Sequence, residues 1–191
     1  INKTLINRKQ PAPNLPGHLR QASSNPDDAV VIITNSRGTA EGAYFAPENV
    51  YPEDLDTIVN EYNSSKQTIR DAWRVFAQLS KLQPFQDGNK RTALIAANLA
   101  YNTWKSENYL TLPFDDIDHA EFMLGLMRFY RAHTKEQEEQ ALNRMVAVLP
   151  SPNEVEYHLS HSLEQRDVDI NDLKTKRIKS FYKNNFDNKN D

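Results

Sequence analysis

The chain has 191 residues, a net charge of −3, 38% hydrophobic and 26% charged residues, and no cysteine. That length allows one domain with a sizeable core, or a domain with a short appendage. The slight excess of acid gives no general attraction to nucleic acid or to an anionic membrane, and the lack of cysteine excludes disulfides and thiolate metal sites.

The composition also bears on location. No apolar run approaches the roughly 20 residues of a membrane span, and no signal-peptide pattern is present. A chain without cysteine fits a reducing cytosol, so we expect a cytoplasmic protein. The chain opens on Ile1 and not on Met, from which we expect that upstream residues have been lost or processed.

Residues 1–28 are rich in proline, asparagine and basic residues, which predicts an N-terminal arm in an extended conformation. The arm contains the segment Pro16-Gly17-His18-Leu19-Arg20. His18 has no other metal-binding side chain near it in sequence, so we interpret it as a solvated loop residue and not as a ligand.

A β-hairpin is predicted at about residues 30–45. Residues 30–33 form a β-branched run, residues 35–38 have turn composition, and residues 43–45 can return as a second strand. Its simplest role is structural, as a cover for one edge of the core.

Two helices are predicted after the hairpin. Pro52 suits the first turn of one, since it is followed by two acidic residues that are favourable to the helix dipole. The other covers about residues 68–82 and has apolar side chains at helical spacing, including Trp73 and Phe76, which we interpret as core.

The loop after this second helix carries the strongest chemical signal, in the string Gln83-Pro84-Phe85-Gln86-Asp87-Gly88-Asn89-Lys90-Arg91. Pro84 cannot continue a helix, and Gly88, one of only five glycines, permits a tight bend. The first N–H groups of the next helix have no internal partners, so a phosphate can bind there, with Lys90 and Arg91 adding charge. Asp87 has the opposite sign and is most simply a ligand for Mg²⁺ that is shared with phosphates. The alternative is an ordinary turn followed by a solvated helical turn.

Residues 90–103 are apolar on almost every side, which predicts a helix at the centre of a bundle. Asn98 and Asn102 lie on one side of this helix. They could hydrogen-bond a nucleobase or satisfy neighbouring backbone groups, and the sequence does not choose between these roles.

The last helices of the core are marked by their caps. Asp115, Asp116 and Asp118 precede one helix; such a cluster could bind a cation, but helix capping explains it more simply. Thr134, with a glutamine three residues later, forms a capping box for the next helix, which Pro150 stops.

Residues 151–191 are predicted to form a helical appendage with a disordered tail. Apolar residues at helical spacing indicate one helix around Val155 and a second one, with a basic flank, around Ile178. His158 and His161 are three residues apart and could share a metal, but no third ligand is evident and a solvated helix face is the simpler interpretation.

The loop resembles the Fic motif, H-P-F-x-D/E-G-N-G/K-R, at seven of nine positions. Residues 16–20 resemble the P-G-x-x-R element that Fic proteins carry ahead of this motif. The chain is thus identified, from about Pro16 to Pro150, as similar to the Fic (Fic/Doc) family. The resemblance implies an all-α, Fic-type helical bundle with a small β-hairpin flap, with the core at residues 29–150.

Three positions depart from the family pattern. Gln83 stands in place of the catalytic His, which takes the proton from the hydroxyl that is modified; losing such a base typically costs about 10²–10⁴ in rate. Lys90 stands in place of the second Gly of the common form, as in Doc toxins, for which the resemblance implies transfer of a terminal phosphate. Leu94 stands where many Fic enzymes carry an Arg that holds the γ-phosphate and pairs with an inhibitory Glu. The near match to an inhibitory helix from Ser160 to Glu164 therefore does not favour autoinhibition.

The resemblance implies transfer of AMP from ATP, with Mg²⁺, to a hydroxyl side chain of a target protein, impaired by Gln83. The alternatives are a Doc-like protein phosphotransferase, or a catalytically silent nucleotide-binding or interaction module. The catalytic positions would be Gln83, Asn89 and Arg91. The phosphate cradle would consist of Asp87, which is also the metal ligand, Gly88, Asn89, Lys90 and Arg91.

The resemblance also implies partners. The flap at about residues 30–45 would hold the target protein by strand addition, because main-chain hydrogen bonds can register unrelated sequences. A small antitoxin-like inhibitor and delivery to another cell are further features that the resemblance allows. Neither nucleic acid nor membrane is an expected partner.

Overall fold

The computed structural model describes residues 17–33 and 43–161. The first part of the N-terminal arm, the hairpin turn, the second C-terminal helix, Glu164 and the disordered tail were predicted from sequence and lie outside these residues. The described residues form helices and one two-stranded antiparallel sheet, so the predicted all-α fold with a small β-hairpin is confirmed. The chain divides into two compact units, Ile1–Pro150 and Ser151–Asp191.

In the first unit, β1 (Val31–Ile33) pairs with β2 (Ala43–Phe45), and Ile32 lies opposite Tyr44 in the register. Successive side chains of a strand point to opposite faces. Ile32 and Tyr44 accordingly pack against the core, whereas Val31 and Phe45 are largely exposed. A short 3-10 helix, η1 (Pro26–Asp28), leads into the hairpin.

The next two helices begin where their sequences predict. α2 (Pro52–Asn63) has its proline in the first turn, and the carboxylate of Asp54 accepts a hydrogen bond from the N–H of Tyr51. α3 (Ile69–Leu82) begins at a capping box in which Thr68 and Asp71 bond each other's backbone N–H groups. Such caps satisfy N–H groups that the helix itself leaves free.

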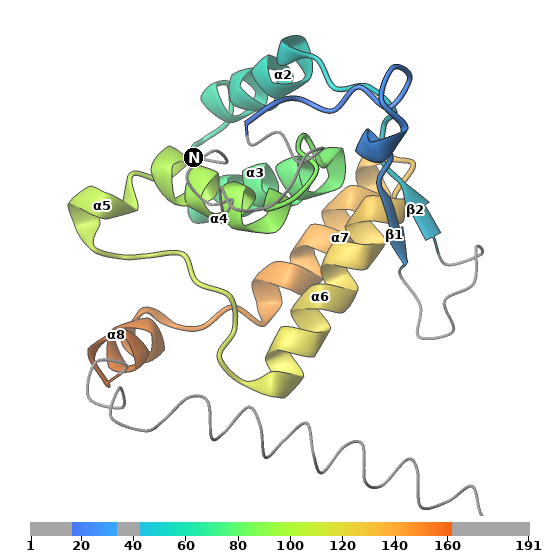
Figure 1. Cartoon of the computed structure of the whole chain (residues 1–191). Coiled ribbons are helices and arrows are strands. Elements are labelled where there is room, and N and C mark those ends of the chain that lie inside the picture. Colours follow the sequence, from blue (N-terminus) through green and yellow to red (C-terminus); the bar gives the residue numbers. More distant parts are fainter. Residues whose placement is uncertain (1–16, 34–42, 162–191) are drawn as a thin grey trace, which may run out of the picture. The chain divides into compact units, whose positions relative to one another are not determined.

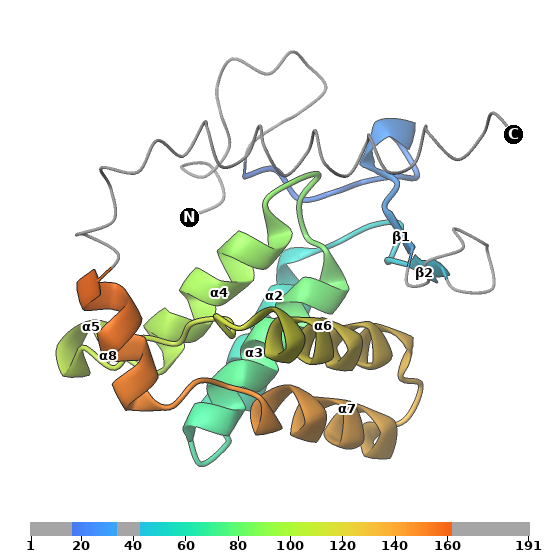
Figure 2. The same ribbon diagram turned by 90° about the horizontal axis from the view of Figure 1, so that it is seen from below.

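Two helix pairs enclose the core of this unit. α3 packs along α4 (Asn89–Ala100), and α6 (Asp116–Arg131) packs along α7 (Lys135–Ala147), as Figures 1 and 2 show. The ring of Trp73 contacts those of Phe76 and Phe122 edge-on, each with centroids 5.3 Å apart. The interpretation of Trp73 and Phe76 as core residues is therefore confirmed.

The aspartates ahead of α6 act as caps. The carboxylate of Asp115 accepts hydrogen bonds from the N–H groups of Ile117 and Asp118, at 2.8 and 3.3 Å. Thr134 in the same way accepts from the N–H of Gln137 at the start of α7. The capping interpretation thus explains both sequence signals.

The prediction that α4 is buried on every side is wrong. Its small residues Ala93 and Ala97 are buried, but Ile95 is 37% and Leu99 54% exposed. Because side chains three and four positions apart share a helix face, the alanines lie on one face and the larger residues on another. α4 also ends earlier than predicted, at Ala100, and a separate short helix, α5 (Thr103–Ser106), follows.

The second unit contains α8 (Pro152–His161). At the start of this helix, the carboxylate of Glu154 accepts a hydrogen bond of 2.7 Å from the N–H of Ser151. The His161 ring stacks on Tyr157. Within the described parts of the chain, no three His, Cys, Asp or Glu side chains are grouped so that they could hold a metal ion. In the same parts, every helix is too short or too polar to cross a membrane.

Candidate active site

The loop between α3 and α4 begins with a residue in the left-handed backbone conformation. Gln83 has φ 51° and ψ 57°, the left-handed conformation, and its N–H bonds the carbonyl of Leu79. Pro84 follows and is fully buried. Since proline has no N–H and cannot continue the helix, the two residues together end α3 and turn the chain sharply.

The loop ends at Gly88, which has φ 76° and immediately precedes the first residue of α4. No side chain caps this helix, so its first N–H groups lack acceptors within the helix. Around this helix end lie the exposed side chains of Asp87, Lys90 and Arg91. The carboxylate of Asp87 accepts from the N–H of Gly88 at 2.6 Å and lies 3.5 Å from the Arg91 guanidinium.

Asn89 holds the loop closed from within. Its side-chain Nδ2 donates to the carbonyl of Phe85 at 2.6 Å and to Oε1 of Gln83 at 3.0 Å. Its Oδ1 accepts from the N–H of Phe85 at 2.9 Å. Asn89 is itself buried. Its side chain therefore fixes the shape of the loop, while its backbone belongs to the start of α4.

Gln83 is buried, and both ends of its amide are engaged. Oε1 accepts from Asn89, and Nε2 donates to the carbonyl of Ser80 at 2.6 Å. A primary amide has no useful basicity near neutral pH, in contrast to imidazole, whose ordinary pKa is about 6.5. At this position the chain thus has a structural hydrogen-bond bridge and no proton acceptor.

Arg20 was not predicted as a site residue, yet it is completely buried beside the loop. Its guanidinium donates to the carbonyl oxygens of Gln83, Asp28 and Pro47, the last two over 2.7 and 2.8 Å. Burial lowers the pKa of the guanidinium, and the nearby Asp28 and Tyr44 oppose that shift. A buried charge that is satisfied by carbonyl oxygens can still be accommodated.

These contacts attach both ends of the hairpin to the loop. Asp28 lies ahead of β1, and its carboxylate accepts from the side chain of Gln86 and from the N–H of Gln21. Pro47 follows β2 and is held by Arg20. The hydroxyl of Tyr44 in β2 donates to the carbonyl of Lys81 near the end of α3, over 2.8 Å. The only sequence signal for this arrangement is the P-G-x-x-R element, because its partners are mostly backbone carbonyls.

The residues at the start of α4 fit Mg²⁺ with a phosphate chain. Uncapped N–H groups and the positive end of the helix dipole favour an anion, and Lys90 and Arg91 add two exposed cations. Mg²⁺ is often held by one or two carboxylates together with phosphate oxygens, and Asp87 is one accessible carboxylate at that place.

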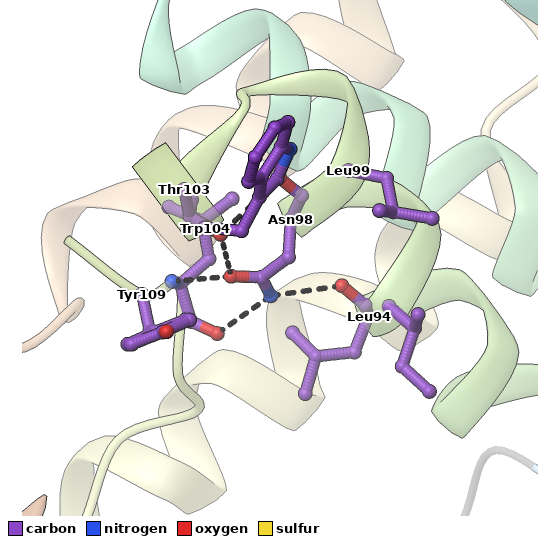
Figure 3. A pocket seen from close by; sticks show the side chains of 8 residues that line it. Leu94, Asn98, Leu99, Thr103, Trp104 and Tyr109 are labelled. Atoms are coloured by element: carbon purple, nitrogen blue, oxygen red, sulfur yellow. Dashed lines mark hydrogen bonds between the residues drawn. The ribbon is translucent and has the colours of Figure 1, made fainter. Parts of the chain in front are cut away.

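Asn98 lies away from this helix end, in a hollow of about 350 Å³ that Leu94, Leu99, Trp104 and Tyr109 help to line (Figure 3). Its Nδ2 donates to the carbonyls of Leu94 and Leu110, and its Oδ1 accepts from the N–H of Leu110 and from the Thr103 hydroxyl. Of the two roles that the sequence left open, satisfying neighbouring backbone groups therefore describes Asn98. Asn102 adopts a left-handed conformation, φ 60°, at the start of α5.

The remaining candidates are the histidines. The ring of His18 is exposed, with Nδ1 2.8 Å from the carbonyl oxygen of Leu19. His158 and His161 both lie on α8, in the second unit. The structure thus gathers Gln83, Asp87, Gly88, Asn89, Lys90 and Arg91 around one loop and helix end.

A model of the Fic/DOC family matches residues 1–101. That range covers more than half of the chain and includes the hairpin, α2, α3, the loop and α4. Comparison with curated proteins gives no significant match, and neither does comparison with solved structures. The match and the geometry of the loop agree that this chain belongs to the Fic/DOC family.

Proposed function

We propose that the chain is a Fic-type nucleotidyltransferase scaffold. It holds the phosphates of ATP, with Mg²⁺, at the start of α4, and transfers AMP to a hydroxyl side chain of a protein bound along the hairpin. Membership of the Fic/DOC family supports transferase chemistry. The choice of AMP as the transferred group rests on the resemblance of the loop to the Fic motif.

The observation that carries the proposal is the shape of the loop. Gly88 in its left-handed conformation brings the backbone to the uncapped start of α4, and Asn89 closes the loop from the buried side. Asp87, Lys90 and Arg91 are left exposed around the N–H groups. Hydrogen-bond donors and cations that are already in position around a developing negative charge account for most of the rate acceleration in phosphoryl transfer.

Gln83 limits this chemistry. In AMP transfer the target oxygen forms a bond to the α-phosphorus, the bond to pyrophosphate breaks, and the hydroxyl proton must leave to an acceptor. The amide of Gln83 cannot take that proton, so it passes to solvent. We expect a rate about 10²–10⁴ lower than that of the same scaffold with a histidine base.

The hairpin supports the choice of a protein as the target. Among the described residues the sheet has two strands, so each strand has one edge without a strand partner, and a peptide can add to such an edge. Hydrogen bonds from Arg20 and Gln86 fix the base of the hairpin to the loop. A segment added to the hairpin is therefore held at a set distance from the phosphates.

Two observations favour other outcomes. Lys90 is exposed at the start of α4 in the place where Doc toxins have a lysine, which favours a Doc-like protein phosphotransferase. The amide bridge between Gln83 and Asn89 favours a nucleotide-binding module without catalysis.

The test is label transfer to a lysate of the source organism, with ATP labelled at the α- or at the γ-phosphate. The wild type is compared with Gln83→His and, as a matched control, with Gln83→Ala, which also removes the amide but supplies no base. We expect α-label transfer to rise about 10²-fold or more in Gln83→His only.

Each other outcome points to a different account. Transfer of γ-label alone would establish phosphotransfer. If none of the three proteins transfers label while all bind Mg²⁺-ATP, the chain is a binding module. An equal gain in Gln83→Ala would show that the imidazole is not what the scaffold lacks.

A further inference from the structure

The helices α6 and α7 pack side by side (Figure 2). Residues of both helices and of the segment between them line a surface groove of about 750 Å³. The helices approach closely there, since a Cβ added at Gly125 would lie 2.7 Å from Cγ of Met145. Apolar side chains of Leu124 and Met127 line the groove, and Leu124 is 52% exposed. The residues that were proposed for nucleotide binding do not line it.

The charged side chains of this groove are all of one sign. Arg128, Arg131 and Arg144 line it together with His133, and none of its lining residues is acidic. The chain as a whole has a net charge of −3, so a cationic groove departs from the general balance. Local fields of this kind select partners of opposite charge.

The nearby carboxylates neutralise only one of the three groove arginines. Glu121 pairs with Arg144. Glu138 pairs with Lys81, and Glu139 pairs with Arg70 and Arg74, and these three basic residues all lie on α3. Within residues 17–33 and 43–161, neither the Arg128 nor the Arg131 side chain makes a hydrogen bond or an ion pair. Two guanidinium groups are thus available to a ligand.

The arrangement of the groove indicates what that ligand is. Leu124, Arg128 and Arg131 are four and three positions apart, so they follow one face of α6. An exposed leucine with arginines one and two turns further along matches a helix that carries apolar residues and carboxylates at the same spacing. Guanidinium groups bind carboxylates through paired hydrogen bonds.

A strand of nucleic acid fits less well. Single-stranded RNA and DNA bind to aromatic side chains on which the bases stack, together with cations for the phosphates. Phe, Tyr and Trp are all missing from the residues that line the groove. A nucleic-acid strand would therefore leave the apolar side chains of Leu124 and Met127 exposed to water.

From these observations we propose that the α6–α7 groove is a docking site for an acidic, amphipathic helical segment of a partner protein. The site is separate from the transferase chemistry. Its occupant places leucine-like side chains over Leu124 and Met127, and carboxylates against Arg128 and Arg131.

The experiment selects binders for the full chain from a display library of helical peptides, and measures the enriched peptides by fluorescence anisotropy. We expect the enriched sequences to combine apolar residues with Asp or Glu at helical spacing. The double variant Arg128→Glu/Arg131→Glu should bind them at least about tenfold more weakly than the wild type, and more so at low salt.

A matched control changes charge elsewhere. Lys66→Glu/Lys105→Glu alters the net charge equally at two exposed lysines outside the groove, and should bind within about twofold of the wild type. Circular dichroism verifies the fold of each variant, with Arg128→Gln/Arg131→Gln as the milder replacement.

The proposal is overturned if the enriched peptides have no excess of acidic residues, or if Arg128→Glu/Arg131→Glu and Arg128→Gln/Arg131→Gln both bind them as the wild type does. Displacement of the peptides by an oligouridine of equal charge would replace it with a nucleic-acid site. A library that yields no peptide dependent on Arg128 and Arg131 would also overturn it.

Discussion

The Nε–H of Arg20 donates to the backbone carbonyl of Gln83, 63 positions later in the chain. This contact joins the segment ahead of the hairpin to the residue with which the loop between α3 and α4 begins. The same guanidinium also holds Pro47, which follows the hairpin. One buried side chain therefore positions the loop and the hairpin relative to each other.

Replacing Arg20 with Gln should destabilise the protein strongly. An amide has fewer donors than a guanidinium, so the buried carbonyls of Gln83 and Asp28 would lose hydrogen-bond partners, at a cost of about 1–3 kcal/mol each. We expect a loss of about 3 kcal/mol in the free energy of unfolding, measured by urea denaturation. Arg128→Gln, at an exposed arginine, is the control and should cost less than about 0.5 kcal/mol. Equal stabilities of the two variants would contradict the role of Arg20.

The left-handed backbone at Gly88 should tolerate asparagine better than alanine. A Cβ at φ 76° costs about 1–2 kcal/mol, and asparagine adopts this conformation more readily than other residues. Gly88→Ala should therefore be about 1 kcal/mol less stable than the wild type, with Gly88→Asn between them, by urea denaturation. An alanine variant as stable as the wild type would mean that the loop does not require this conformation.

The sequence predicted the elements whose signals are local. Asp115 and Thr134 both cap the helices that their patterns indicated, and the hairpin strands lie within the predicted range. The candidate residues of the loop also came from one contiguous string. These features depend on neighbouring residues, so short patterns are enough to find them.

The features that the sequence did not predict depend on distant contacts. The guanidinium of Arg20 donates to backbone carbonyls from three other segments. Every residue has a backbone carbonyl, so the sequence does not indicate which ones bind Arg20. The exposed face of α4 was missed because composition alone does not reveal which side packs against α3. The inward direction of the Asn89 side chain likewise follows from the closed shape of the loop, which the motif string does not state.

Because α6 and α7 approach closely at Gly125, a larger residue at this position should destabilise the protein. Gly125→Ala would place a Cβ 2.7 Å from Cγ of Met145 and 3.3 Å from the carbonyl oxygen of Ala141. Overpacking of this kind costs about 1–3 kcal/mol. Adding Met145→Ala removes the closer contact, so a double-mutant cycle in urea should show a favourable coupling. Strictly additive losses would indicate that the helices are not in contact there.

The ion pairs of Glu139 should make stability depend on acid pH. Hydrogen bonds from Arg74 lower the pKa of this carboxyl below its ordinary 4.5. A carboxyl with a lower pKa in the folded state stabilises it above pH 4.5, and that contribution is lost as the pH falls through the folded-state pKa. Since the Glu139 side chain is 44% exposed, we expect its contribution to the free energy of unfolding to be less than about 1 kcal/mol.

Glu139→Gln tests this directly, because it keeps the shape and removes the titration. Urea midpoints measured from about pH 3 to pH 7 should change less with pH in the variant than in the wild type. The idea fails if both proteins show the same pH dependence.

The start of α4 is predicted to bind the phosphates of ATP with Mg²⁺. The most direct measurement is calorimetric titration of Mg²⁺-ATP into the wild type, into Lys90→Ala/Arg91→Ala and into the control Lys66→Ala/Lys105→Ala. We predict binding that requires Mg²⁺, weakened at least about tenfold by the loss of Lys90 and Arg91 and unchanged in the control. Equal affinity in all three proteins, or no binding to the wild type, would contradict the account.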